Sequence, residues 1–292
     1  MQINNTTGDF FKLYQSDPEF DIETYQHLHP EIFHTYFKGY CKKTPEKMQA
    51  ATDNYTADYN KLKKVAALLP DVIQKAERRM KAYFGFHIDA CVHIFTGIYA
   101  SNAFVDHSMD MYFAIEKLEP DARILEVIVI HEMIHSYHYH LLGRAGIDWL
   151  AINWKDTRNS MYLEGVATYF SQKLAPGHSD SVYFSYDNKG EEWLSFCQNQ
   201  HKKIIEFYLS DLIRDSQTMM RDWFRLSVHP HFGYNRLGYF LGTAFVAELF
   251  SQLPETDVFT LLADDLVSEK ANQWLKRTTH EETKGHLPLF HP

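Results

Sequence analysis

The five residues His131-Glu132-Met133-Ile134-His135 constrain this chain more than any other stretch of its sequence. They end an apolar run, residues 124–130, that is typical of a buried helix. Residues four apart lie on one face of a helix, so the two imidazoles are expected to project side by side. Each imidazole can give zinc one nitrogen at roughly 2.0–2.1 Å. Glu132, one residue after the first histidine, is placed to act as a general base toward a water on that metal.

A carboxylate that can complete this site comes 29 residues after His135 (164 − 135). Residues 160–172 are predicted to form a helix that ends before Pro176-Gly177, and Glu164 lies in its first half. Gly165 comes next, and glycine inside a helix costs up to ~1 kcal/mol relative to alanine, so it usually marks close packing. We expect Gly165 to let this helix approach the helix of the two histidines, with Glu164 as the third zinc ligand. The alternative is a glutamate on a solvated face, against which its apolar neighbours argue.

The composition excludes several classes of protein. The chain has 292 residues, 45% of them hydrophobic, and a formal net charge of −9, which argues against nucleic acid or an anionic membrane surface as a partner. Its three cysteines are too few and too scattered for a disulfide framework or a cysteine-rich zinc site. The N-terminus lacks the basic and apolar regions of a signal peptide, and no apolar run approaches the ~20 residues that span a bilayer. We therefore expect a soluble, cytoplasmic protein, although export without a classical signal would leave no trace in the sequence.

The periodicity of the apolar residues predicts an α+β fold. Residues 1–84 are expected to be helical, with one helix from near Thr44 and a longer one over residues 58–83 that is interrupted at Pro70. Residues 87–95 and 109–116 alternate between apolar and polar side chains, which predicts two half-buried strands. Residues 97–106 between them fit an edge strand or a plain connection. An edge strand has free N–H and C=O groups that can pair with an extended peptide.

The remaining chain is predicted to be helical. The helix that carries the two histidines should begin at residues 118–121 and end before Gly143, a predicted C-cap. Residues 186–225 form further helices, and residues 229–253 begin as a turn and continue as a helix in which Gly238 and Gly242 leave one face smooth. Polar residues near the start of that helix could donate to a developing oxyanion: His231, Tyr234, Arg236 and Tyr239. We predict one domain over residues 1–292 in two lobes, composed of a helical part (1–84), the sheet with the histidine helix (85–142) and a helical C-terminal lobe (143–292).

The two-part motif, His131-Glu132-x-x-His135 followed by Glu164-Gly165-x-Ala167, resembles the gluzincin metallopeptidases, most of all the bacterial family of predicted zinc-dependent proteases. The stretch Ser101-Asn102-Ala103-Phe104 resembles the substrate-binding edge strand of thermolysin-like enzymes. The resemblance implies a zincin-like fold, with a small mixed sheet, an active-site helix and a mostly helical second lobe. It also implies that Asn102, Ala103 and Phe104 bind the substrate. Thermolysin-like enzymes often carry an aspartate one turn after the glutamate ligand; here that position is Thr168, so the group that orients the zinc histidines is not identified.

Three functional hypotheses are consistent with these motifs. In the first, one Zn²⁺ per chain is held by His131, His135 and Glu164, Glu132 is the general base, and a peptide or protein substrate is hydrolysed in the manner of an endopeptidase. In the second, the same scaffold binds or regulates without turnover. In the third, the zinc site hydrolyses a non-peptide amide or an ester.

Overall fold

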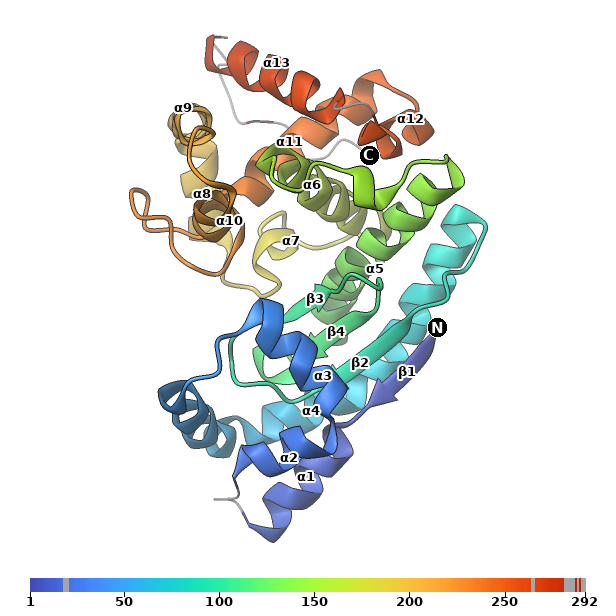
Figure 1. Ribbon diagram of the computed structural model, residues 1–292, viewed down its shortest axis with the longest axis vertical. Helices are drawn as coiled ribbons and strands as arrows, with labels where there is room; N and C mark the ends of the chain where they lie inside the picture. The colour runs from blue at the N-terminus through green and yellow to red at the C-terminus, as the bar shows by residue number, and fades with distance from the viewer. Residues whose placement is uncertain (18–20, 264–265, 281–286, 288, 290–292) are drawn as a thin grey trace. The chain divides into compact units, whose positions relative to one another are not determined.

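Four short strands form one mixed sheet in the order β1-β2-β4-β3 (Figure 1). The strands are β1 (Gln2–Asn5), β2 (Cys91–Phe95), β3 (Ala103–Val105) and β4 (Met111–Ala114). The first three in that order run parallel, and β3 pairs with β4 in the antiparallel sense at one edge. The computed structural model describes residues 1–17, 21–263, 266–280, 287 and 289. In these residues helices far outnumber strands, so the predicted α+β class with a small mixed sheet is confirmed.

The prediction that residues 1–84 are entirely helical was wrong at its start. Residues 2–5 form β1, which pairs in register with β2 from Gln2 opposite Cys91 to Asn5 opposite Ile94. Four residues are too few for a period of two to stand out in a sequence. The strand therefore depends on its partner, which comes more than 80 residues later in the chain.

The two central strands are more deeply buried than predicted. Every residue of β4 is buried, as are residues 92–95 of β2, so neither strand has a solvated face. The polar residue His93 is only 8% exposed, because its ring stacks on Tyr112 and its Nδ1 lies 3.2 Å from the Asn4 amide nitrogen. The expectation of half-buried strands was wrong, because successive residues on both faces of these strands are buried, and the alternation of residue types did not reveal this.

Helices precede the central strands in the chain. They are α1 (Thr7–Ser16), α2 (Ile22–Leu28), α3 (Pro30–Thr35), the π-helical turn η1 (Tyr36–Tyr40) and α4 (Pro45–Phe84). The predicted start of α4 is confirmed, since the Thr44 hydroxyl accepts a hydrogen bond from the backbone N–H of Lys47. The predicted separate helix over residues 58–83 and its interruption at Pro70 were both wrong, because α4 is one helix of 40 residues that continues through Pro70.

The stripe of buried residues on α4 explains why the helix tolerates Pro70. Proline in a helix interior removes one backbone hydrogen bond and clashes with the preceding turn, at a cost of ~3 kcal/mol. Apolar side chains on both sides of it are buried, and together they offset that cost. They are Leu62, Val65, Ala66, Leu69, Val72, Ile73, Ala76 and Met80.

The helix with the histidine motif, α5 (Ala122–Arg144), comes after the short helix η2 (Ile115–Lys117). It does not end before Gly143, as predicted, but one residue after it. The cap is Gly146, which has a left-handed φ of 76°. The N–H groups of Gly146 and Ile147 donate to the carbonyls of Gly143 and Leu142, the pattern of a Schellman motif.

The chain divides into two compact units, residues 1–136 and 137–292, with the boundary inside α5. The second unit is helical in the residues that the structure describes. Its helices are η3 (Trp149–Ala151), α6 (Thr157–Leu174), α7 (Val182–Ser185), α8 (Glu191–Asn199), α9 (His201–Asp211), α10 (Ser216–Phe224), α11 (Leu237–Gln252), α12 (Glu255–Phe259) and α13 (Leu266–His280).

Helices α6 and α11 pack closely against each other in this unit. A Cβ atom on Gly165 would overlap the backbone of Gly242, so the two helices touch backbone to backbone. The smooth face predicted from Gly238 and Gly242 is confirmed, but the expected partner of Gly165 was wrong: its close neighbour is α11 rather than the histidine helix. Across the described part of the chain, no helix combines the length and the apolar character needed to cross a membrane.

Candidate metal centre

The two histidines of the motif lie one turn apart on α5, in the arrangement that their spacing predicts. His131 is 2% exposed and His135 is partly exposed. Their ring centroids are 5.0 Å apart and the ring planes are nearly perpendicular, at 83°. The rings therefore do not stack on each other, and nitrogen atoms of both can be directed toward one point.

Glu164 of α6 joins these two histidines. The group His131, His135 and Glu164 offers one ligand atom from each residue, and these atoms all lie within 4.8 Å of one another. It is the one such group of three or more histidine, cysteine or acidic residues found among the described residues. The sequence thus identified all three members before any geometry was known.

This donor set fits a zinc ion in its chemistry. Two imidazole nitrogens and one carboxylate oxygen are a common catalytic ligand set for zinc, with bonds of about 2.0–2.2 Å and a fourth position left for water. Ligand atoms around one tetrahedral ion are separated by roughly 3.4 Å. The three ligand atoms, all within 4.8 Å of one another, lie near that separation.

Glu132 is also buried, with 7% of its surface exposed. It directly follows the first proposed ligand in the sequence, which is the position of the general base in this motif. Thr168, at the position where an aspartate would be expected from the resemblance, is fully buried, and its hydroxyl makes no hydrogen bond in the described structure. Thr168 therefore does not replace that aspartate.

Two of the four predicted oxyanion donors are engaged with other groups in the C-terminal unit. The ring of His231 stacks on Phe207 with centroids 4.0 Å apart. The Tyr234 hydroxyl donates to Glu192 Oε1 at 2.8 Å, and its ring stacks on Phe196. Both side chains thus have a structural role on the loop before α11.

Arg236 and Tyr239 form a separate cluster at the start of α11. The guanidinium of Arg236 lies over the rings of Tyr239 and Tyr186, at 5.5 and 5.4 Å from their centroids. Arg236 also has a left-handed φ of 54°, which an arginine adopts only when its surroundings hold it there. Sequence reasoning missed Tyr186, because a single tyrosine in a connecting segment carries no pattern. Oxyanion stabilisation by Arg236 or Tyr239 stays a prediction.

The three predicted substrate-binding residues lie on the edge strand or next to it. Phe104 is only 6% exposed, because its ring is stacked between those of Tyr40 and Tyr112. Its side chain is thus part of the core of the first unit. Asn102 and Ala103 are half-buried, and the Asn102 side-chain oxygen accepts the backbone N–H of Ala103 at 2.9 Å.

A second buried glutamate, Glu116, was not singled out by the sequence. Its carboxylate accepts the backbone N–H groups of Gly97 at 2.8 Å and Tyr99 at 3.0 Å, on the loop before β3. Burial raises the pKa of Glu116 to about 7, even though both hydrogen bonds favour the charged form. Gly97 leaves room for this contact, because a Cβ atom on it would come within 2.7 Å of the Glu116 carboxylate, which would have to shift.

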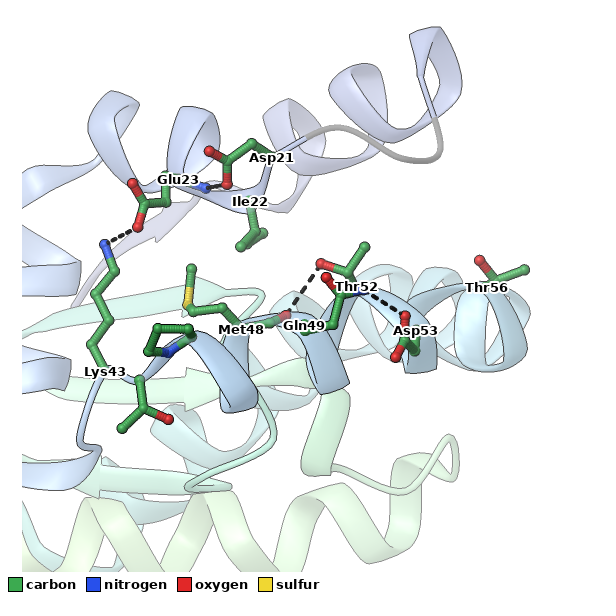
Figure 2. A pocket seen from close by; sticks show the side chains of 11 residues that line it. Asp21, Ile22, Glu23, Lys43, Met48, Gln49, Thr52, Asp53 and Thr56 are labelled. Carbon is green, nitrogen blue, oxygen red and sulfur yellow. Dashed lines mark hydrogen bonds and ion pairs between the residues drawn. The ribbon is translucent and has the colours of Figure 1, made fainter.

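A pocket of about 1000 Å³ lies between the start of α2 and the first turns of α4 (Figure 2). Its charged groups are paired locally: Lys43 with Glu23, and Asp53 with the Gln49 amide. None of its lining residues belongs to the metal group or to the predicted substrate residues. It offers no reactive constellation of its own.

Comparison with known proteins adds no family to this geometry. No family model, curated protein or solved structure matches the chain. The basis for assigning a function is therefore the chemistry of the metal group itself.

Proposed function

We propose that this protein is a zinc-dependent peptidase with a zincin-like arrangement of sheet and active-site helix. The observation that carries the proposal is the convergence of His131, His135 and Glu164 within 4.8 Å, with Glu132 next to the first ligand. A chance group of this composition would not also be expected to have a buried carboxylate at that position. The edge strand β3 in the same unit as the histidines supports a peptide as the substrate.

Each residue of the group has a distinct task in this proposal. His131, His135 and Glu164 would hold the ion, which when bound would supply Lewis acidity toward the substrate carbonyl and acidify water. Glu132 takes a proton from the attacking water and passes it to the leaving amine. The N–H and C=O of Ala103 align the peptide backbone.

Two alternatives use the same residues. A protein that binds peptides without turnover would keep the zinc group, and so would a hydrolase of another amide or of an ester. Glu132 favours an enzyme over a silent scaffold, because a buried carboxylate directly after the first ligand is where metal-activated hydrolysis needs its general base.

The test is Glu132→Gln, measured for zinc content and for cleavage of a proteome-derived peptide library. This variant should keep about one zinc per chain while turnover falls by at least 10²-fold, the lower end of what general acid–base catalysis contributes. Wild-type protein with zinc and no cleavage of any peptide would reject the peptidase. Equal cleavage by the wild type and the variant would reject Glu132 as the base.

A further inference from the structure

The free edge of β3 offers few backbone groups to a partner chain, and their positions are set by its pairing with β4. Asn102 and Asp106, on either side of β3, both hydrogen-bond toward β4: Ala114 N–H donates to Asn102 C=O, and Asp106 N–H donates to Asp110 C=O. Paired residues of antiparallel strands alternate between bonded and non-bonded pairs. The register, with Phe104 opposite Tyr112, makes Ala103 and Val105 the residues whose N–H and C=O point away from the sheet.

Two tyrosines of η1 form hydrogen bonds with backbone groups at the two ends of this edge. The Tyr36 hydroxyl accepts the N–H groups of Ile98 at 3.2 Å and Ala100 at 3.4 Å, before the strand. The Tyr40 hydroxyl donates to the Val105 carbonyl at 2.8 Å, at the end of the strand. A partner strand would place its own N–H at about 2.9 Å from that carbonyl, so Tyr40 stands where the partner would lie.

The Tyr40 side chain is held in place by a stack of aromatic rings. Its ring stacks on Phe104 with centroids 3.6 Å apart and planes at 15°, and Phe104 is itself stacked on Tyr112. The Ala103 N–H donates to the side-chain oxygen of its neighbour Asn102 at 2.9 Å, and a partner's carbonyl would have to replace that oxygen. The Ala103 carbonyl receives one long bond of 3.4 Å from the Ser101 hydroxyl, which is weaker than the 2.8 Å bond from Tyr40 to the Val105 carbonyl.

We infer that Tyr40 limits the substrate: an extended peptide pairs with Ala103 and is stopped at Val105 by the Tyr40 ring and hydroxyl. The inference rests on the proposed peptidase function. It assigns Tyr40 as a specificity-determining residue for the length of the bound segment on the Val105 side of the edge.

The experiment compares wild type, Tyr40→Phe and Tyr40→Ala, each loaded with zinc, on peptides that the wild type cleaves. The peptides are extended by one to three residues at either end. Tyr40→Phe removes the hydroxyl but retains the stacked ring, whereas Tyr40→Ala removes both. Extension at one end only should raise kcat/KM in Tyr40→Ala, by about fivefold for each gained hydrogen bond, and should leave the wild type unchanged. Tyr40→Phe should show a smaller gain at the same end.

A second readout does not depend on turnover. The same peptides are bound to zinc-loaded Glu132→Gln with and without Tyr40→Ala, and hydrogen exchange is measured at single backbone amides. Peptide binding should protect the Ala103 amide in both proteins and the Val105 amide only when Tyr40 is replaced. Should Tyr40→Ala fail to fold, Tyr40→Phe decides with the same two measurements.

The outcomes separate the two proposals. If all three proteins cleave with the same dependence of kcat/KM on peptide length, and the Val105 amide gains no protection from exchange when Tyr40 is replaced, the role of Tyr40 is overturned. The peptidase proposal would then stand. Zinc binding without cleavage by any of the three would reject the peptidase and, with it, the substrate limit at Tyr40.

Discussion

A Cβ atom placed on Gly165 would overlap the backbone carbonyl of Gly242, and one placed on Gly242 would overlap the carbonyl oxygen of Met161. Each glycine therefore faces the backbone of the opposite helix, and its lack of a side chain allows that helix to approach. Because Glu164 immediately precedes Gly165, this contact also fixes the position of the proposed third ligand along α6.

Replacing either glycine should destabilise the protein. In Gly165→Ala and Gly242→Ala the added methyl group meets backbone, which cannot rotate away, so we expect a loss of about 3 kcal/mol or more in the free energy of unfolding, at the upper end of overpacking costs. Gly143→Ala is the matched control, because nothing lies within 4 Å of its added Cβ atom. That change should be neutral or stabilise by up to ~1 kcal/mol. Urea unfolding measures all three, and equal stability of Gly165→Ala and Gly143→Ala would contradict the close packing.

Removing the proposed third ligand should weaken metal binding without unfolding the protein. Glu164→Ala leaves two imidazoles, and we expect zinc affinity to fall by at least about 100-fold, more than is typical for losing a group that only orients a ligand. Glu206→Ala, at an exposed glutamate of α9, should bind zinc like the wild type. Competition with a chromogenic chelator measures both. Unchanged affinity in Glu164→Ala would remove Glu164 from the metal site.

Stability should depend on pH through Glu116. Burial raises the pKa of its carboxyl from the ordinary 4.5 to about 7, so between these values the folded protein holds a proton that the unfolded chain has released. The folded state is then favoured at low pH and loses this contribution as the pH rises through that window, by at most about 3 kcal/mol. Glu116→Gln cannot titrate. The free energy of unfolding of the wild type, relative to this variant, should fall between pH 5 and pH 8; parallel curves would show that Glu116 does not titrate in that range.

Pro70 should be a site where a single change stabilises the protein. Pro70→Ala restores a backbone donor inside α4 and removes a clash with the preceding turn. It also raises the conformational entropy of the unfolded chain, which offsets part of this effect, so we expect the free energy of unfolding to rise by about 1–2 kcal/mol. Ala67→Pro, at an exposed position one turn earlier, tests the opposite change and should cost ~3 kcal/mol. Thermal unfolding distinguishes the two. A lower melting temperature for Pro70→Ala would mean that the proline is needed for the path of α4.

Phe104 should behave as a core residue rather than as a substrate contact. Its ring lies between Tyr40 and Tyr112 and is 6% exposed, so Phe104→Ala should cost about 3–5 kcal/mol of stability. Phe104→Leu retains most of the volume and should cost much less. A Phe104→Ala protein of wild-type stability with a raised KM would instead support the direct substrate contact that the resemblance implies.

The features that could be predicted from the sequence are those encoded within a few residues. The spacing of His131 and His135, the helix start near Thr44 and the smooth face at Gly238 and Gly242 all depend on local period or backbone chemistry, and the structure agrees with each. Of the two alternatives for residues 97–106, the structure has the edge strand. Glu164 lies 29 residues after His135, but its prediction also depended on a local signal, a carboxylate among the apolar residues of one helix.

The tertiary structure alone decided which distant segments meet. It paired β1 with β2, it kept α4 continuous through Pro70, and it placed Gly165 against Gly242 instead of the histidine helix. It also enclosed Glu116 behind the loop at Gly97 and set Tyr40 against the Val105 carbonyl. Hydrogen-bond pairing and burial between segments far apart in the chain leave no periodic pattern in either segment, so the sequence alone could not predict them. The sequence therefore determined the ligands of the proposed metal site, whereas the packing determined what surrounds the edge strand.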